Sequence, residues 1–301
     1  MFTGAALLGV LQLIALHAVV GWASSASMSV QRVAVVTGGN KGIGLEIVKK
    51  LAALPDCTCV LTSRNEKLGR EALAKLEGDG LHPMYKQLDI GDPASVERFA
   101  AEMESEYGRV DVLVNNAGFA FKGSDPTPFM DQAEPTFKTN YFDTVGLTER
   151  MLPLVRKSSA GRIVNVSSRS GLLRIVPDPQ LRAKFTSPSL TKEELNSLAS
   201  KFVADVKART HTAQGWPSSN YGMSKLCLTA YTKVVAREEK EKGTGVLVNS
   251  CCPGYCDTDM TSNKGPRPPE EGARTPFMLA VNLPTGGPTG LFFGEEAAIP
   301  W

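Results

Sequence analysis

The sequence predicts a doubly wound α/β fold built on one parallel sheet. From Gln31 onward, short apolar runs alternate with longer amphipathic stretches. Parallel strands need crossover connections of about a dozen residues or more, and such βαβ units are right-handed. A glycine-rich turn also joins the first predicted strand to the first predicted helix. We therefore expect a single α/β domain over residues 29–301.

The expected elements follow one another without an internal repeat. Each strand is an apolar run rich in β-branched residues, and each helix carries apolar residues at helical spacing. The predicted strands span residues 32–37, 57–62, 84–88, 110–114, 161–166 and 245–250, with an edge strand at 291–293. The predicted helices span residues 42–54, 66–77, 94–107, 128–155 and 221–241.

A proline-containing stretch interrupts this alternation between Ser168 and Tyr221. Within it, Thr191 and Glu194 have the spacing of a capping box, and residues 195–209 have helical periodicity. A structureless loop of that length is uncommon in a compact domain. We therefore expect a helical insertion over about residues 171–216.

Composition excludes several classes of protein. The chain has 33 Lys and Arg against 31 Asp and Glu, and this near-balance does not indicate a nucleic-acid binder. A hydrophobic content of 42% excludes wholesale disorder. The 6 cysteines and 3 histidines lack the spacing of a metal site or a disulfide framework. We expect reduced cysteines and no metal.

Residues 1–28 form an apolar extension outside the predicted domain. The stretch 5–20 is apolar except at Gln12 and His17, and small residues follow it. It is shorter than the roughly 20 residues of a membrane span. No Lys or Arg precedes it, as would be usual in a signal peptide. Two interpretations stay open: a secretory signal or membrane anchor, and a dispensable extension.

The glycine-rich turn predicts a dinucleotide site. Gly38, Gly42 and Gly44 keep the spacing Gly-x3-Gly-x-Gly. Residues without a Cβ let the backbone approach a pyrophosphate at the helix N-terminus. Asn40 and Ile43 belong to the same turn and are expected to contact the cofactor.

The end of the second strand indicates which dinucleotide binds. An acid there would accept the ribose 2′-hydroxyl of NAD, but the segment 62–65 contains Arg64 and no carboxylate. A guanidinium suits a 2′-phosphate, and Lys41 is a second cation within reach of it. We therefore predict NADP(H) as the cofactor.

Two further strand ends carry expected cofactor contacts. Asp89 and Ile90 follow the third strand, where a carboxylate can accept from the adenine amine. Asn116 follows the fourth strand. Ligands of open parallel sheets bind at the carboxyl ends of strands.

Four residues make a candidate catalytic group. Tyr221 and Lys225 stand at i and i+4, on one helix face. A nearby cation favours the phenolate, so we expect Lys225 to lower the pKa of Tyr221 toward neutrality. Ser168 follows the fifth strand and can donate to a carbonyl oxygen. The amide of Asn140 could order a water that leads to Lys225.

These motifs occur in the order seen in the short-chain dehydrogenase/reductase family. The sequence resembles its NADPH-dependent carbonyl reductase branch over roughly residues 30 to 301. Segments that carry the closer resemblance are Ala-Phe-Lys at 120–122, Gly-Trp-Pro-Ser-Ser-Asn-Tyr at 215–221 and Cys-Cys-Pro-Gly at 251–254. The resemblance implies a Rossmann-type sheet and NADPH-dependent reduction of a ketone, aldehyde or quinone. The alternative function is an inactive NADP(H)-binding sensor or scaffold.

The resemblance also implies roles for individual residues. Tyr221 would donate a proton to the substrate carbonyl, and Lys225 would hold the nicotinamide ribose. Ser168 would orient the carbonyl, and Asn140 would position a relay water. The residues that would line the nicotinamide amide are Cys256, Asp257 and Thr258.

This chain departs from the family pattern at the pocket wall. Tyr255, a predicted substrate contact, and Asp257 stand where many carbonyl reductases have a tryptophan and a basic residue. Arg169 places a charge directly after Ser168. The insertion covers helices that form a dimer interface in typical members, so we expect a monomer. We expect a cytoplasmic location, or the secretory pathway or ER membrane if residues 1–28 act as a signal or anchor.

Overall fold

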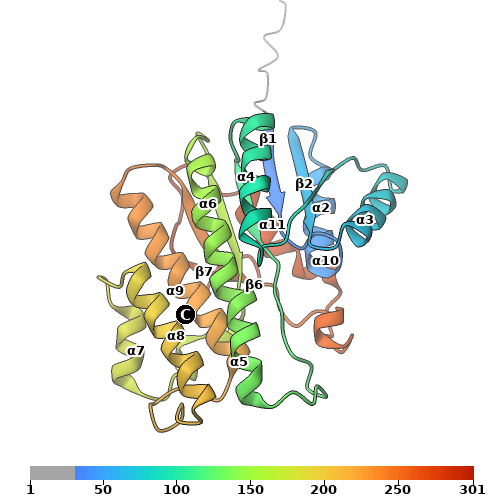
Figure 1. Ribbon diagram of the computed structural model, residues 1–301. Coiled ribbons are helices and arrows are strands. Elements are labelled where there is room, and N and C mark those ends of the chain that lie inside the picture. The colour runs from blue at the N-terminus through green and yellow to red at the C-terminus, as the bar shows by residue number, and fades with distance from the viewer. Residues whose placement is uncertain (1–30) are drawn as a thin grey trace, which may run out of the picture. The chain divides into compact units, whose positions relative to one another are not determined.

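Short β-branched runs form the strands of the computed structural model, which describes residues 31–301 (Figure 1). The strands are β1 (Arg32–Val36), β2 (Cys57–Ser63), β3 (Met84–Gln87), β4 (Val112–Asn115), β5 (Arg162–Val166), β6 (Leu247–Cys252), β7 (Phe292–Gly294) and β8 (Ala297–Ala298). They form one sheet in the order β3-β2-β1-β4-β5-β6-β7-β8. Only β8 pairs antiparallel to its neighbour, among the described strands. The predicted doubly wound α/β fold is confirmed.

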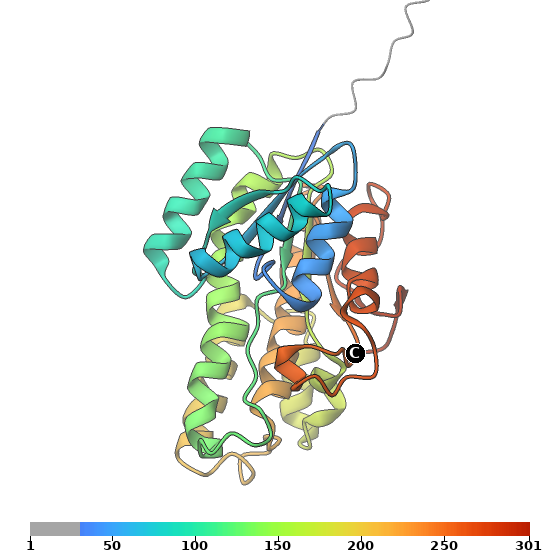
Figure 2. The ribbon, with the colours of Figure 1, turned by 90° about the vertical axis from the view of Figure 1, so that its right-hand side faces the viewer.

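The helices cover both faces of this sheet (Figures 1 and 2). They are α2 (Gly42–Ala52), α3 (Glu66–Gly78), α4 (Pro93–Tyr107), α5 (Phe129–Phe137), α6 (Thr144–Arg156), α7 (Pro179–Thr186), α8 (Lys192–Lys207), α9 (Asn220–Glu241), α10 (Pro269–Gly272) and α11 (Arg274–Val281). Apolar side chains of α4, α6 and α9 pack on one face, and those of α2, α3 and α11 pack on the other.

Strand order reverses between β1 and β4, and this reversal positions the site. The chain runs from β1 outward to β3 and then returns to β4 on the other side of β1. The loops that leave β1 and β4 therefore diverge, which opens a crevice at the carboxyl ends of the strands. The turn after β1 and the segment after β4 both reach this crevice.

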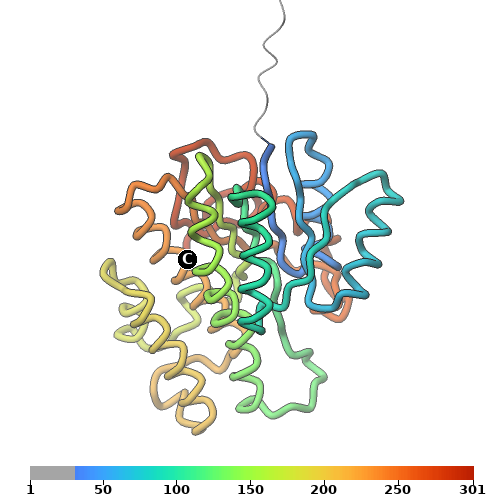
Figure 3. Tube along the Cα trace, turned by 45° about the horizontal axis from the view of Figure 1, so that its top comes forward, coloured from blue at the N-terminus to red at the C-terminus, as the bar shows by residue number. Residues whose placement is uncertain are grey.

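The predicted insertion is helical, as expected. Helix α8 begins with a capping box in which Thr191 Oγ1 accepts from the Glu194 amide and a Glu194 carboxylate oxygen accepts from the Thr191 amide. The Trp216 ring packs edge-on against Phe185 of α7 and Phe202 of α8. The two helices lie beside α9, on the side of the molecule away from α3 (Figures 1 and 3).

Several elements differ from the prediction. The helix predicted over 128–155 is divided into α5 and α6 by a π-helical turn at Lys138–Asp143. There the Thr144 hydroxyl donates to the Thr139 carbonyl, five residues earlier. Strand β6 ends at Cys252, two residues later than predicted. Helices α10 and α11 were not predicted, because the prolines in them resemble those of a loop.

The N-terminal extension predicted over residues 1–28 lies outside the described residues. Among residues 31–301, no helix is both long enough and apolar enough to cross a bilayer.

Candidate active site

The turn after β1 has a backbone that requires glycine. Gly38 and Gly42 have positive φ angles of 62° and 54°, which side chains with a Cβ rarely adopt. A Cβ on Gly44 would lie 2.3 Å from the Gly38 carbonyl oxygen and 2.3 Å from Asn116 Nδ2. The Asn116 amide donates to the carbonyl oxygens of Thr37 and Gly38, at 2.8 and 3.2 Å. Asn116 thus fixes the shape of the turn.

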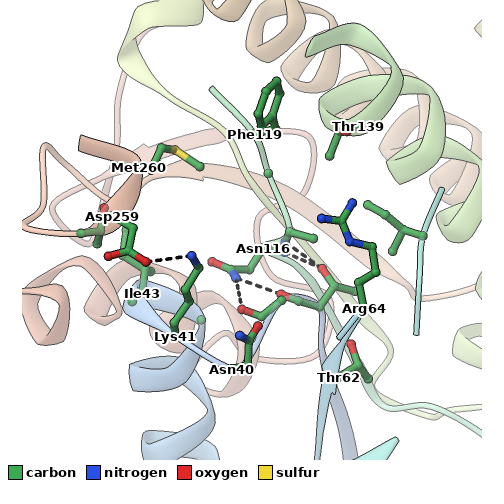
Figure 4. Close-up of a pocket in the computed structure, with 18 of the residues that line it drawn as sticks. Asn40, Lys41, Ile43, Thr62, Arg64, Asn116, Phe119, Thr139, Asp259 and Met260 are labelled. Carbon is green, nitrogen blue, oxygen red and sulfur yellow. Dashed lines mark hydrogen bonds and ion pairs between the residues drawn. The ribbon is translucent and has the colours of Figure 1, made fainter. Parts of the chain in front are cut away.

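The N-terminus of α2 is open to a ligand. Lys41 occupies the N-cap position without a capping hydrogen bond from its side chain, and the first turn holds no acidic residue. The free amides and the helix dipole therefore favour an anion at this position. Lys41 Nζ instead lies 2.8 Å from Asp259, and both side chains are exposed (Figure 4). Lys41 therefore reaches across the turn to the segment after β6.

A cavity of about 670 Å³ extends from this turn along the carboxyl ends of the strands. It brings together most of the predicted cofactor contacts. Those lining it are Gly38, Asn40, Lys41, Gly42, Ile43, Gly44, Arg64, Asp89, Ile90, Asn116, Asp257 and Thr258. The combination of an open helix N-terminus, a glycine cradle and a cationic end fits a phosphorylated dinucleotide.

Arg64 supplies the cationic end of this cavity. It is exposed, and no carboxylate of residues 31–301 lies within ion-pair distance of its guanidinium. Its own carbonyl oxygen accepts from Gln87 Nε2 at 3.1 Å, which fixes the backbone there. Arg64 is therefore available to a phosphate, whereas Lys41 shares its charge with Asp259 (Figure 4).

A second cavity, of about 800 Å³, adjoins the first. Ile43, Thr258 and Met260 line both cavities. Four predicted site residues line the second cavity and not the first: Ser168, Tyr221, Tyr255 and Cys256. Cys256, predicted to line the nicotinamide amide, is thus on the second cavity, while its neighbour Asp257 is on the first.

Helix α9 carries Tyr221 and Lys225 between the two cavities. Tyr221 lines the second cavity. Lys225 Nζ is buried, donates to the Val166 carbonyl oxygen at 2.9 Å and lies 5.8 Å from the centre of the Tyr221 ring. A Cβ on Gly118, which lines the first cavity, would be 3.4 Å from Lys225 Nζ. The pair therefore connects one cavity to the other.

The pKa values of this pair differ from the prediction. Burial raises the pKa of Tyr221 to about 12, although interaction with the Ser168 side chain acts in the opposite direction. Burial also lowers the pKa of Lys225 to about 8. The Tyr221 pKa is therefore raised and not lowered as predicted, because loss of solvent disfavours the charged phenolate.

Asn140 is fully buried in the π-helical turn. Its Oδ1 accepts from the Phe119 amide at 2.7 Å, and its Nδ2 donates to the Phe119 carbonyl oxygen and to Ser224 Oγ, at 2.8 and 3.0 Å. Both amide hydrogens are therefore used. Of the side-chain amide, the second lone pair of Oδ1 remains for a water, and the predicted role of this amide in ordering a water stays a prediction.

Other residues of the site were not predicted. Phe119, Thr139, Asp259 and Met260 line the first cavity (Figure 4). Lys122, Arg267 and Glu295 line the second. Of these, only Lys122 lies in a motif that the sequence singled out, the Ala-Phe-Lys segment after β4.

The fold and site together define a nucleotide-binding α/β protein in which a tyrosine–lysine pair lies between two adjoining cavities. A family model described as short chain dehydrogenase matches residues 32–180 and 205–268. The chain belongs to this family.

Named relatives are similar over most of the chain. Carbonyl reductase (NADPH) 1 of Homo sapiens is 46% identical, over 89% of this chain and 98% of its own length. Carbonyl reductase (NADPH) 3 of Mus musculus is 44% identical, over 91% and 99%. Among solved structures, salutaridine reductase from Papaver somniferum is 33% identical with a TM-score of 0.80, covering 87% of this chain and 99% of its own.

Proposed function

We propose that this protein reduces ketone, aldehyde or quinone carbonyl groups to alcohols with NADPH. The observation that carries the proposal is the position of helix α9. Tyr221 faces one cavity, and Lys225, one turn further on, lies against Gly118 of the other. The carbonyl reductase names of relatives at 44% to 46% identity support the same reaction and cofactor.

Positively charged or partly positive groups at two places in the first cavity would bind the phosphates of the cofactor. The amides at the N-terminus of α2 would bind the pyrophosphate, and Arg64 would bind the 2′-phosphate. Asp89, held by a 2.9 Å hydrogen bond from the Gly91 amide, would accept from the adenine amine. Bound NADPH supplies a hydride to the carbonyl carbon of the substrate.

Tyr221 would donate the matching proton to the carbonyl oxygen. With a pKa of about 12, its phenol keeps the proton at neutral pH, as a proton donor must. The Ser168 hydroxyl would hydrogen-bond the same oxygen as negative charge develops there. Lys225 would stabilise the phenolate that remains, and a water on Asn140 Oδ1 would pass a proton from bulk solvent to it.

A substrate panel tests this function. Purified protein is mixed with NADPH and either menadione or an aromatic aldehyde, and NADPH absorbance is followed. We expect NADPH oxidation with a matching yield of the alcohol or hydroquinone. Tight NADPH binding with no turnover of any ketone, aldehyde or quinone would overturn the proposal.

We also propose that the protein is a monomer. Helix α8 packs along α5 and α9, which supports this, because it covers helix faces that would otherwise be open to a second subunit. Size-exclusion chromatography with light scattering measures the mass directly. A dimer mass at micromolar concentration would contradict the proposal.

For location, we propose the cytoplasm. The six unpaired cysteines support a reducing compartment. Fractionation of cells that express the full chain tests it. Recovery in the membrane pellet or the secreted fraction would contradict it.

A further inference from the structure

The second cavity is lined by more positive than negative side chains. Lys122, Arg169, Lys264 and Arg267 line it, and together we call them the cationic wall. Glu295 is the one carboxylate among the described residues that line this cavity. The lining therefore has a net charge of +3 at neutral pH. The four residues of the cationic wall come from three segments of the chain, which follow β4, β5 and β6.

Glu295 does not neutralise the wall. Arg267 Nη2 donates to it at 2.7 Å, and Arg169 Nη1 lies 3.7 Å from the same carboxylate oxygen. One carboxylate is thus shared between two guanidinium groups. The second distance is too long for a hydrogen bond, so Arg169 keeps its donors for another acceptor.

The positive charges of the two lysines in the cationic wall are balanced still less by nearby carboxylates. Within residues 31–301, no carboxylate lies within 4.0 Å of Lys122 Nζ or Lys264 Nζ. Asp259 is the acid that Lys122 influences, and Asp259 is already paired with Lys41. Both lysine side chains are exposed and can turn toward a ligand.

The remaining lining is largely apolar, close to the proposed reaction centre. Tyr255 and Met260 are 55% and 40% exposed, which is unusual for large apolar side chains. The Phe121 ring packs edge-on against Phe119 at 4.8 Å. Arg169 lines the same cavity as Ser168, whose hydroxyl is proposed to bind the carbonyl oxygen.

We propose that the preferred substrates are apolar carbonyl compounds that carry an anionic group such as a carboxylate. The aromatic and thioether side chains would hold the apolar body, and the cationic wall, Arg169 above all, would hold the anion. A guanidinium binds a carboxylate through two parallel hydrogen bonds, which also orients the substrate. This assignment rests on the carbonyl reductase function proposed above.

The test compares 4-carboxybenzaldehyde with its neutral ester, methyl 4-formylbenzoate. Each kcat/KM is measured at saturating NADPH, at low and high salt, in the wild type, Arg169→Gln and Lys264→Gln. The ester is intrinsically more electrophilic, so the decisive quantity is the change in the acid-to-ester ratio. Arg174→Gln is the matched control, because Arg174 is exposed, five residues from Arg169, and lines neither cavity.

We expect Arg169→Gln to lower the acid-to-ester ratio by about tenfold and Lys264→Gln by about threefold. Salt should lower the ratio in the wild type and do so less in both variants. Arg174→Gln should keep the wild-type ratio. A ratio unmoved by Arg169→Gln, Lys264→Gln and salt, with the ester still reduced, would overturn this inference alone. Failure to reduce either aldehyde while menadione is reduced would overturn this inference, and failure with all substrates of the panel would overturn the carbonyl reductase function as well.

Discussion

The Lys225 ammonium donates a 2.9 Å hydrogen bond to the carbonyl oxygen of Val166, the last residue of β5. A second bond runs the other way, from Ser167 Oγ to the Lys225 carbonyl oxygen, also at 2.9 Å. Helix α9 and the end of β5 are therefore joined through both the side chain and the main chain of Lys225. This fixes Ser168, which follows, relative to Tyr221.

Tyr221→Phe should reduce the rate of NADPH oxidation by at least about a hundredfold, because it removes the proposed proton donor. NADPH affinity, measured by fluorescence titration, should change little. Tyr107→Phe is the control, since Tyr107 lies on α4 and lines neither cavity. Turnover at the wild-type rate in Tyr221→Phe would remove Tyr221 from its proposed role.

Lys225→Met should abolish turnover but increase the free energy of unfolding at pH 7. Burial lowers the pKa of Lys225 from 10.5 to about 8, which corresponds to a cost of about 3 kcal/mol for the charged form. Loss of the hydrogen bond to Val166 offsets about 1 kcal/mol of that gain. A net stabilisation of about 2 kcal/mol should appear in urea unfolding curves.

The stability difference between the wild type and Lys225→Met should depend on pH, and the direction of this dependence can be predicted. The unfolded chain holds the Lys225 proton up to about pH 10.5, and the folded chain releases it near pH 8. Wild-type stability therefore rises, relative to the variant, between these values. The advantage of Lys225→Met should shrink between pH 7 and pH 10. An equal advantage at both pH values would show that Lys225 does not titrate as described.

Arg64→Ala should weaken NADPH binding by about ten- to a hundredfold and NADH binding far less, because only NADPH carries the 2′-phosphate. Isothermal titration with both cofactors measures this. Arg70→Ala is the control, since Arg70 is on α3, bonded to Glu66 and outside the cofactor cavity. Equal losses for the two cofactors would refute the assignment of Arg64.

Gly44→Ala should abolish NADPH binding. Its new methyl group would lie 2.3 Å from the Gly38 carbonyl oxygen and would push the turn away from Asn116. Gly78→Ala is the control on α3, where no atom lies within 4 Å of the new methyl group. It should stabilise the protein by about 0.5 kcal/mol. Normal NADPH affinity in Gly44→Ala would mean that the turn does not cradle the pyrophosphate.

The sequence predicted best those structural features that depend on local patterns of residues. Strand and helix periodicity predicted the sheet, and the glycine spacing predicted the turn whose backbone requires Gly38 and Gly42. The capping box at Thr191 and Glu194 was also confirmed. Each of these features depends on residues that are close together in the chain.

Features that depend on distant contacts could not be predicted. The ion pair between Lys41 and Asp259 joins residues 218 positions apart. The side chain of Asn140 is used by Phe119 and Ser224, which no pattern around Asn140 indicates. The pKa of Tyr221 depends on how completely the fold removes solvent, and the Tyr-x3-Lys spacing contains no information on that.

Ile43, Thr258 and Met260 line both cavities. A replacement at any of these three positions changes the shape of both cavities in a single mutational step. A mutation at one of these positions that is selected for a new substrate must therefore also preserve the affinity for the dinucleotide. Diversification of substrate choice is less constrained at Arg169 or Tyr255, which line the second cavity alone.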